Sequence, residues 1–128
     1  MALASFRYGL RKFLRFSKEF LATADLTPEQ YEALLAIKSF ASAAGLLVGQ
    51  LSERLQVRHH STVALTHRLV ARGLVTKERS STDRRQVSVR LTAAGLTALE
   101  AMAVVHREAI RLHAPEIMAA LRHIEKRD

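Results

Sequence analysis

The sequence predicts a mainly helical fold with one small β-hairpin, in the α+β class, on three observations. Apolar residues recur at helical spacing through most of the 128 residues. After Gly73 the period changes to that of a strand. With 48% apolar residues, the chain can fill one hydrophobic core and is too short for two ordinary domains. We therefore predict a single domain over residues 1–128.

Residues 1–25 are predicted to form one amphipathic helix. Apolar side chains repeat at helical intervals from Phe6, continue past Glu19 and reach Asp25. Residues 1–18 are basic and contain no acidic side chain, which is also the composition of an organellar presequence or a membrane-surface helix. Because the apolar repeat continues beyond that stretch, we favour an integral helix.

A second helix is predicted to begin at about Pro28. Thr27 is a residue type that caps helices, Pro28 suits the first helical position, and Gln30 stands where a capping box requires it. We expect this helix to end at residues 44–45, an alanine followed by a glycine.

Two shorter helices are predicted next, over residues 48–55 and 58–72. In the longer one, Leu65 and Leu69 mark the side that faces the core. Gly73 follows it and suits the backbone conformation that ends a helix.

A hairpin with a charged tip is predicted after these helices. One strand begins at Val75, residues 87–91 alternate apolar with polar side chains, and the polar stretch 80–85 lies between them. Helix, short turn, helix and two-stranded hairpin is the order of a winged helix-turn-helix. We assign this lobe to residues 28–92.

A long helix is predicted after the hairpin, with Thr92 as its cap. Apolar and histidine residues then follow a spacing of three and four, which is typical of a seam against another helix. The residues on this seam are Leu96, Leu99, Ala103, His106, Ile110 and His113. Pro115 is expected to break the helix, and a short final helix to follow it.

Charge and composition narrow the choice of partner. Twenty Lys and Arg residues against twelve Asp and Glu residues give a net charge of +8. Residues 47–92 hold nine of the basic and three of the acidic residues, a concentration that suits docking on phosphates. The absence of cysteine excludes disulfides, thiolate metal sites and cysteine nucleophiles. No apolar run is long enough for a bilayer span, so we expect a cytoplasmic protein without a membrane partner.

Three stretches of the sequence resemble the MarR family of bacterial transcriptional regulators: residues 47–57, 61–75 and 83–95. The most specific is the last, an Asp-Arg-Arg followed by alternating apolar residues and Leu-Thr-x-x-Gly. The resemblance covers residues 26–117. It implies a homodimer that binds a pseudo-palindromic operator in double-stranded DNA.

The resemblance also implies roles for both ends of the chain. Residues 1–25 and 93–128 would provide the dimerisation helices, and a pocket for a small aromatic or anionic ligand would lie where the lobes meet them. Our candidates for the dimer contact or this pocket are Phe13, Phe20, Leu99, His106, Ile110 and His113.

Helical geometry selects DNA-binding candidates in residues 58–72. Opposite the inward Leu65 lie His60, Val63 and His67, which suit contacts with base edges or a thymine methyl. The residues that begin the helix, where backbone N–H groups and side-chain donors meet a phosphate, are Arg58, His59 and Ser61. For each histidine, the alternative is a surface residue or a helix cap.

In the wing, Arg84 and Arg85 are the best-placed cations for a narrow minor groove or its phosphate rim. Asp83 is expected to hold one of these arginines in position, or only to close the turn. Weaker candidates for phosphate contacts are Arg54, Arg72, Lys77 and Arg79.

An enzymatic role has little support. Ser61 lies beside two histidines, but a triad needs an oriented base in a concave site. His106 and His113 are seven residues apart and face one side, which would suit a metal or ligand, although two imidazoles fall short of a full ligand set. We therefore expect no catalytic residue, no metal and no cofactor beyond an unknown small-molecule effector.

These observations predict a sequence-specific DNA-binding transcriptional regulator that responds to a ligand. Repression through operator occupancy is the expected mode by analogy with the family. Two alternatives stay open: an architectural protein that coats DNA without sequence preference, and a winged-helix module that binds a protein partner.

Overall fold

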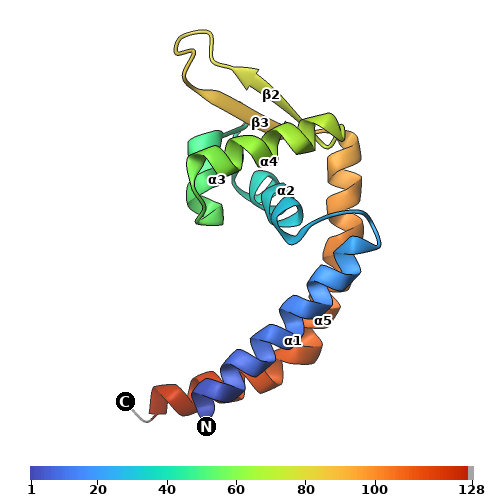
Figure 1. Ribbon diagram of the computed structural model, residues 1–128, viewed down its shortest axis with the longest axis vertical. Coiled ribbons are helices and arrows are strands. Elements are labelled where there is room, and N and C mark those ends of the chain that lie inside the picture. Colours follow the sequence, from blue (N-terminus) through green and yellow to red (C-terminus); the bar gives the residue numbers. More distant parts are fainter. Residues whose placement is uncertain (127–128) are drawn as a thin grey trace. The chain divides into compact units, whose positions relative to one another are not determined.

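The computed structural model describes residues 1–126 and divides into two compact units. The winged-helix unit spans Thr27–Ala101, and the terminal unit comprises Met1–Leu26 with the stretch that begins at Met102. In chain order, the elements are α1 (Ala2–Ala22), α2 (Pro28–Phe40), β1 (Leu46–Leu47), α3 (Val48–Leu55), α4 (His59–Ala71), β2 (Val75–Arg79), β3 (Val87–Leu91) and α5 (Ala93–Lys126) (Figure 1). The fold is mainly helical with a small antiparallel sheet, as predicted.

Helix α2 begins with the predicted capping box. The Gln30 backbone N–H donates to Thr27 Oγ1 at 3.1 Å, and the Thr27 N–H donates to Gln30 Oε1 at 3.1 Å. The expected end of this helix at residues 44–45 is wrong, because α2 stops at Phe40. Ala41 is already extended, and Ser42 Oγ accepts the Ala44 N–H at 3.2 Å, which forms a turn before the glycine is reached.

The sheet has three antiparallel strands in the order β1-β3-β2. The predicted hairpin is its larger part, with Val75 opposite Leu91 and Arg79 opposite Val87. Strand β1 was missed in the sequence, since two residues are too few to show an alternation. It pairs Leu46 with Val89 at the edge of the sheet and leads directly into α3.

The core of the winged-helix unit lies between its helices and this sheet. Leu65 and Leu69 of α4 are buried, as predicted from their spacing. Side chains with essentially no exposure come from three helices and two strands around the same centre: Leu34, Ile37, Leu51, Leu69, Val75 and Val89. This packing holds α3, α4 and the hairpin in fixed mutual positions.

The Leu-Thr-x-x-Gly motif joins the first turn of α5 to the end of α4. Thr92 Oγ1 accepts the Gly95 N–H at 3.0 Å and donates to the Gly73 carbonyl at 2.6 Å. A Cβ atom at position 95 would lie 2.0 Å from the carbonyl oxygen of Leu74, so only glycine permits this approach. The motif therefore has a structural explanation within the fold.

In the terminal unit, α1 packs against α5 in the antiparallel sense. Gly9 approaches Ile117 near one end, and Ser17 contacts His106 further along. Lys12 Nζ donates to Glu116 Oε2 at 2.8 Å, and this hydrogen bond raises the pKa of Lys12 above its ordinary value. Within residues 1–126, no helix is both long and apolar enough to cross a membrane.

The predicted break at Pro115 is wrong, since α5 continues through this residue to Lys126. A proline inside a helix removes one hydrogen bond and costs about 3 kcal/mol. Contacts with α1 follow the proline directly: Ile117 packs on Gly9 and Glu116 pairs with Lys12. Tertiary packing therefore overrides the local preference.

Candidate nucleic-acid interface

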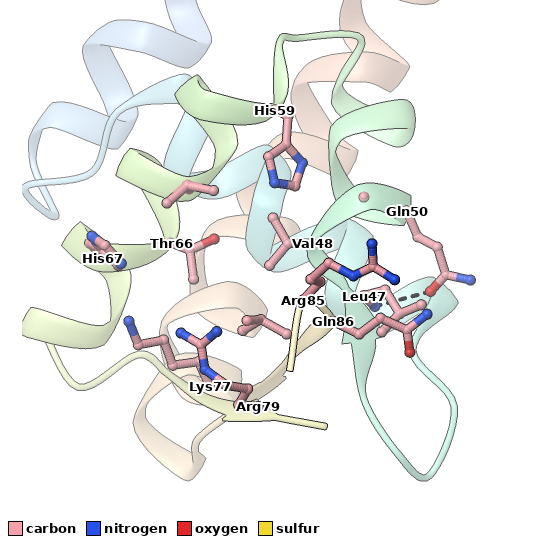
Figure 2. Close-up of a pocket in the computed structure, with 13 residues that line it drawn as sticks. Leu47, Val48, Gln50, His59, Thr66, His67, Lys77, Arg79, Arg85 and Gln86 are labelled. Atoms are coloured by element: carbon pink, nitrogen blue, oxygen red, sulfur yellow. Dashed lines mark hydrogen bonds between the residues drawn. The ribbon is translucent and has the colours of Figure 1, made fainter. Parts of the chain in front are cut away.

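A groove of about 570 Å³ separates α4 from the wing, which we define as β2, β3 and the tip between them. Helix α4 contributes His59, Val63, Thr66 and His67 to this α4–wing groove, and the first turn of α3 forms its end (Figure 2). The wing contributes Lys77, Arg79, Arg85, Gln86 and Val87. All of these residues belong to the winged-helix unit.

The α4 residues in the groove share one helical face, at intervals of three, four and seven residues. Val63 and His67 were predicted on this side. His59 was predicted at the helix start and also lies in the groove. His60 is exposed but lies outside it. Their contact with DNA stays a prediction.

The helix start is open to solvent. Arg58 occupies the N-cap position with an exposed side chain, and within residues 1–126 no side chain caps α4. The backbone N–H groups of this first turn point outward without helical acceptors, as at every helix start. Ser61 is exposed and lines a separate cavity with Leu55 and Val57. The geometry suits an anion at the end of α4.

In the part of the chain that the structure describes, the charged side chains that line the groove are all basic. Lys77, Arg79 and Arg85 provide three cations, and the two imidazoles on α4 face them. Among the described residues that line the groove, none is acidic. Because walls of a single sign focus the field, the groove favours a polyanion.

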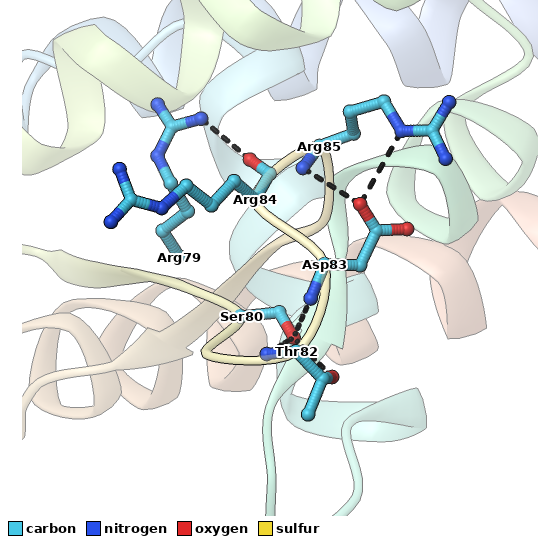
Figure 3. A network of polar contacts seen from close by, with 6 residues as sticks. All are labelled: Arg79, Ser80, Thr82, Asp83, Arg84 and Arg85. Carbon is cyan, nitrogen blue, oxygen red and sulfur yellow. Dashed lines mark hydrogen bonds and ion pairs between the residues drawn. The ribbon is translucent and has the colours of Figure 1, made fainter.

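The wing tip, residues 80–86, is held by its own hydrogen bonds (Figure 3). Ser80 Oγ accepts the backbone N–H groups of Thr82 and Asp83, each at 3.2 Å. Asp83 Oδ1 accepts the Arg85 backbone N–H at 3.0 Å and lies 3.4 Å from Arg85 Nε. Of the two candidate arginines, Arg85 is thus the one beside Asp83.

Arg79 and Arg84 are connected through the backbone. Arg79 Nη1 donates to the Arg84 carbonyl oxygen at 2.6 Å, so the guanidinium supports the tip from the strand beneath it (Figure 3). The Arg84 side chain is exposed and does not line the groove. Arg79 therefore has a structural contact in addition to its predicted role at a phosphate.

Two other predicted phosphate contacts lie elsewhere in the winged-helix unit. The Arg54 guanidinium stacks over the Phe40 ring at 3.7 Å from its centroid. Arg72 Nη1 lies 3.4 Å from Gln30 Oε1. Neither residue lines the α4–wing groove, so the structure does not bring them together with the groove cations.

The candidates for a dimer contact or ligand pocket fall in both units. Phe13 and Phe20 meet His106 edge-on, and Phe13 also meets His113, with ring centroids 5.8–6.4 Å apart. Leu99 is buried in the winged-helix unit, and Ile110 is 50% exposed in the terminal unit. Among the described residues, no group of three histidine or carboxylate side chains is placed to hold a metal ion.

Sequence reasoning missed Thr66, Gln86 and the first turn of α3. Thr66 was overlooked because its spacing from Leu65 and Leu69 assigns it to neither face clearly. Gly49 and Gln50 were read only as part of a short helix, although a helix start beside a basic hairpin is a signal for an anion site.

Packed helices α2–α4 with a three-stranded sheet and a projecting hairpin define a winged-helix protein. A family model described as "MarR family" matches residues 24–86. A putative transcriptional regulatory protein for the hcr operon of Thauera aromatica is 31% identical over 93 residues, which cover 73% of this chain and 54% of that protein. The chain thus spans about half the length of this curated relative.

Solved structures agree with this classification. MepR from S. aureus in its DNA complex superposes with a TM-score of 0.77 and 19% identity, covering 96% of this chain and 95% of that one. A MarR variant from E. coli complexed with operator DNA has a TM-score of 0.72 and 25% identity, covering 94% of this chain and 88% of that one. The matched region, residues 24–86, is thus similar in sequence to the MarR family, and the fold is similar to that of solved MarR proteins.

Proposed function

We propose that this protein is a sequence-specific DNA-binding transcriptional regulator. The observation that carries the proposal is the α4–wing groove, whose charged walls are entirely cationic or imidazole among the described residues. The match of residues 24–86 to a family model described as "MarR family" supports it, as do the two DNA complexes among the structures it resembles.

In this proposal α4 enters the major groove of the duplex. His60, Val63 and His67 contact base edges, while Arg58, His59 and Ser61 meet a phosphate at the helix start. Lys77 and Arg79 add phosphate contacts along the groove.

The wing then reaches the adjacent minor groove or its rim. Arg84 and Arg85 are exposed cations at the tip, and Asp83 restrains Arg85. A narrow minor groove concentrates negative potential, so it attracts such arginines. Arg54 and Arg72 act at most on outlying phosphates, since both have contacts within the protein.

Two copies are needed to read a pseudo-palindromic operator. The terminal unit exposes large apolar side chains that a second copy would cover: Leu3, Leu14, Val104, Ile110, Leu112, Met118 and Leu121. A two-fold dimer would present its two α4 helices about 34 Å apart, one turn of the duplex. Occupancy of the operator then hinders the polymerase, which makes the protein a repressor.

Regulation by a small aromatic or anionic molecule completes the proposal. A ligand that shifts the spacing of the two α4 helices lowers operator affinity, because both must dock together. The aromatic and imidazole cluster of Phe13, Phe20, His106 and His113 offers suitable contacts. Neither a metal nor an organic cofactor is required.

The test is a comparison of two duplexes at two salt concentrations. An operator is first selected from random duplexes, and its affinity is measured by fluorescence anisotropy beside a scrambled duplex. A sequence-specific regulator binds the operator on the order of a thousandfold or more tightly at physiological salt. Nearly equal affinities with a steep salt slope would instead indicate an architectural DNA binder. Failure to bind either duplex would point to a protein-interaction module.

A further inference from the structure

One end of the α4–wing groove is a helix start that is not capped. Leu47 occupies the N-cap position of α3 and carries no hydrogen-bond acceptor, and within residues 1–126 no side chain caps this helix. Gln50 Oε1 accepts the Leu47 N–H at 3.0 Å. The N–H groups of Val48, Gly49 and Gln50 have no acceptor inside the helix, and the helix dipole places partial positive charge there.

Thr66 provides a second and independent feature of the same groove. Its side chain is 3% exposed, and among residues 1–126 its Oγ1 has no hydrogen-bond partner. Thr62, one turn earlier in α4, donates to the Arg58 carbonyl at 3.2 Å, the usual bond of a helical threonine. Thr66 makes no such bond, and Figure 2 shows its hydroxyl turned into the groove toward Val48. A buried hydroxyl without a partner calls for an external acceptor.

Gly49 adds a steric observation. It is exposed in the first turn of α3, and a Cβ atom there would meet nothing within 4 Å. Neither the packing nor the backbone of the protein therefore requires glycine at this helical position, where alanine is the better helix former. A glycine at such a place permits close approach of a ligand to the backbone.

The identity of that ligand follows from the position of the groove. When α4 occupies the major groove of a duplex and the wing its neighbouring minor groove, the strand that divides these grooves passes between the two elements. The α4–wing groove is therefore the place of a sugar-phosphate backbone. Its cations, Lys77, Arg79 and Arg85, suit the same chemistry.

We propose that the first turn of α3 and the Thr66 hydroxyl together hold one phosphodiester group of the DNA strand that runs through the α4–wing groove. The proposal rests on the DNA-binding function proposed above. Thr66 Oγ1 is buried in the free protein, so binding of the phosphate requires the side chains that cover it to move. This contact reads no base and fixes the register of α4 on the duplex.

The first experiment compares Thr66→Val with Thr62→Val as a matched control. Valine keeps the shape of threonine and removes the hydroxyl. We expect Thr66→Val to weaken binding of operator and scrambled duplex by the same factor, roughly tenfold for a hydrogen bond to a charged acceptor. Its melting temperature should stay equal or rise, because no bond is lost in the free protein. Thr62→Val should lower the melting temperature and leave the affinity unchanged.

A second variant tests the α3 side of the site. Gly49→Ala should raise the melting temperature and weaken binding of both duplexes, since the added methyl group stands where the strand approaches. In a series of duplexes, each has one phosphate replaced by a neutral methylphosphonate. The wild-type protein should bind more weakly when the replaced phosphate is the one held by this site. At that position Thr66→Val should lose no further affinity.

Two results separate failure of this proposal from failure of the proposed function. If wild type binds the operator, and both Thr66→Val and Gly49→Ala bind it equally well, the phosphate site is wrong while DNA binding stands. If wild type binds neither duplex, the proposed function itself is wrong. A loss of affinity in Thr66→Val that comes with a lower melting temperature would also contradict the proposal.

Discussion

Single buried contacts determine how the terminal unit is assembled. His106 is 4% exposed, and its Nδ1 lies 2.9 Å from the Met102 carbonyl, which can only accept. Nδ1 therefore donates to this carbonyl, and Nε2 lies 2.7 Å from the Ser17 hydroxyl. The buried hydrogen bond between Ser17 and His106 links α1 to α5.

Ser17→Ala should destabilise the protein, because it removes the buried hydrogen bond between the Ser17 hydroxyl and the His106 ring. Such a loss amounts to about 1–3 kcal/mol, which lowers the melting temperature by several degrees. Thermal unfolding followed by circular dichroism measures it. Ser5→Ala, an exposed serine on the same helix, is the control. Equal melting temperatures for both variants would show that the pair contributes nothing.

Glu32 gives a pH-dependent prediction. Partial desolvation of its carboxyl group, and secondly the charge of Glu29, raise the pKa of Glu32 above its ordinary value of 4.5. Between the ordinary pKa of the unfolded chain and the raised pKa of the folded protein, the folded protein binds more protons than the unfolded chain. The free energy of unfolding therefore falls as the pH rises through this window. Glu32→Gln should therefore be more stable than wild type at neutral pH, by no more than about 0.5 kcal/mol for an exposed side chain. The gain should vanish below the ordinary value, and a gain that persists in acid would contradict this cause.

At the base edges, His67 should discriminate between sequences. His67→Ala is expected to cost on the order of 1–3 kcal/mol on the operator and little on scrambled DNA. Anisotropy titrations with both duplexes measure the difference. Equal losses on the two duplexes would show that His67 contacts only phosphate.

At the level of elements, the wing is a hairpin whose tip is held by hydrogen bonds from its own side chains. Asp83, Ser80 and Arg79 all bond to tip backbone, which restricts where the exposed Arg85 can lie. Arg85 has a side chain that is 92% exposed, so its removal should affect ligand binding more than folding.

Arg85→Ala should weaken DNA binding and reduce the slope of log affinity against log salt by about one, with little change in melting temperature. Titrations over a series of salt concentrations give the slope. Arg122→Ala, an exposed cation on α5, should leave both quantities unchanged. An Arg85→Ala protein with wild-type affinity would remove the wing from the mechanism.

The elements also show where sequence reasoning succeeds and where it ends. Helices α3 and α4 and the hairpin follow from periodicity and end signals, which are local. Strand β1 forms through long-range pairing of Leu46 with Val89, and α5 continues through Pro115 along the stretch that packs against α1. Thr66 lines the groove because of how α4 packs against the wing, and no local sequence pattern specifies that packing.

The whole molecule has two properties that lie on different parts of the chain. The winged-helix unit has basic side chains around one groove. The terminal unit exposes several large apolar side chains, which monomeric proteins usually bury. In the proposed dimer, contacts between terminal units would place two winged-helix units on one duplex. Affinity and specificity would then depend on both units docking in register.

The central claim is tested most directly by changing the spacing of the operator. Wild type is titrated with the selected palindrome, with a single half-site, and with a palindrome whose halves are separated by about five extra base pairs, half a turn of the duplex. The account predicts that the extended palindrome binds no more tightly than the half-site, and that two chains bind each intact operator. Equal affinity for both palindromes, or one chain per operator, would contradict it.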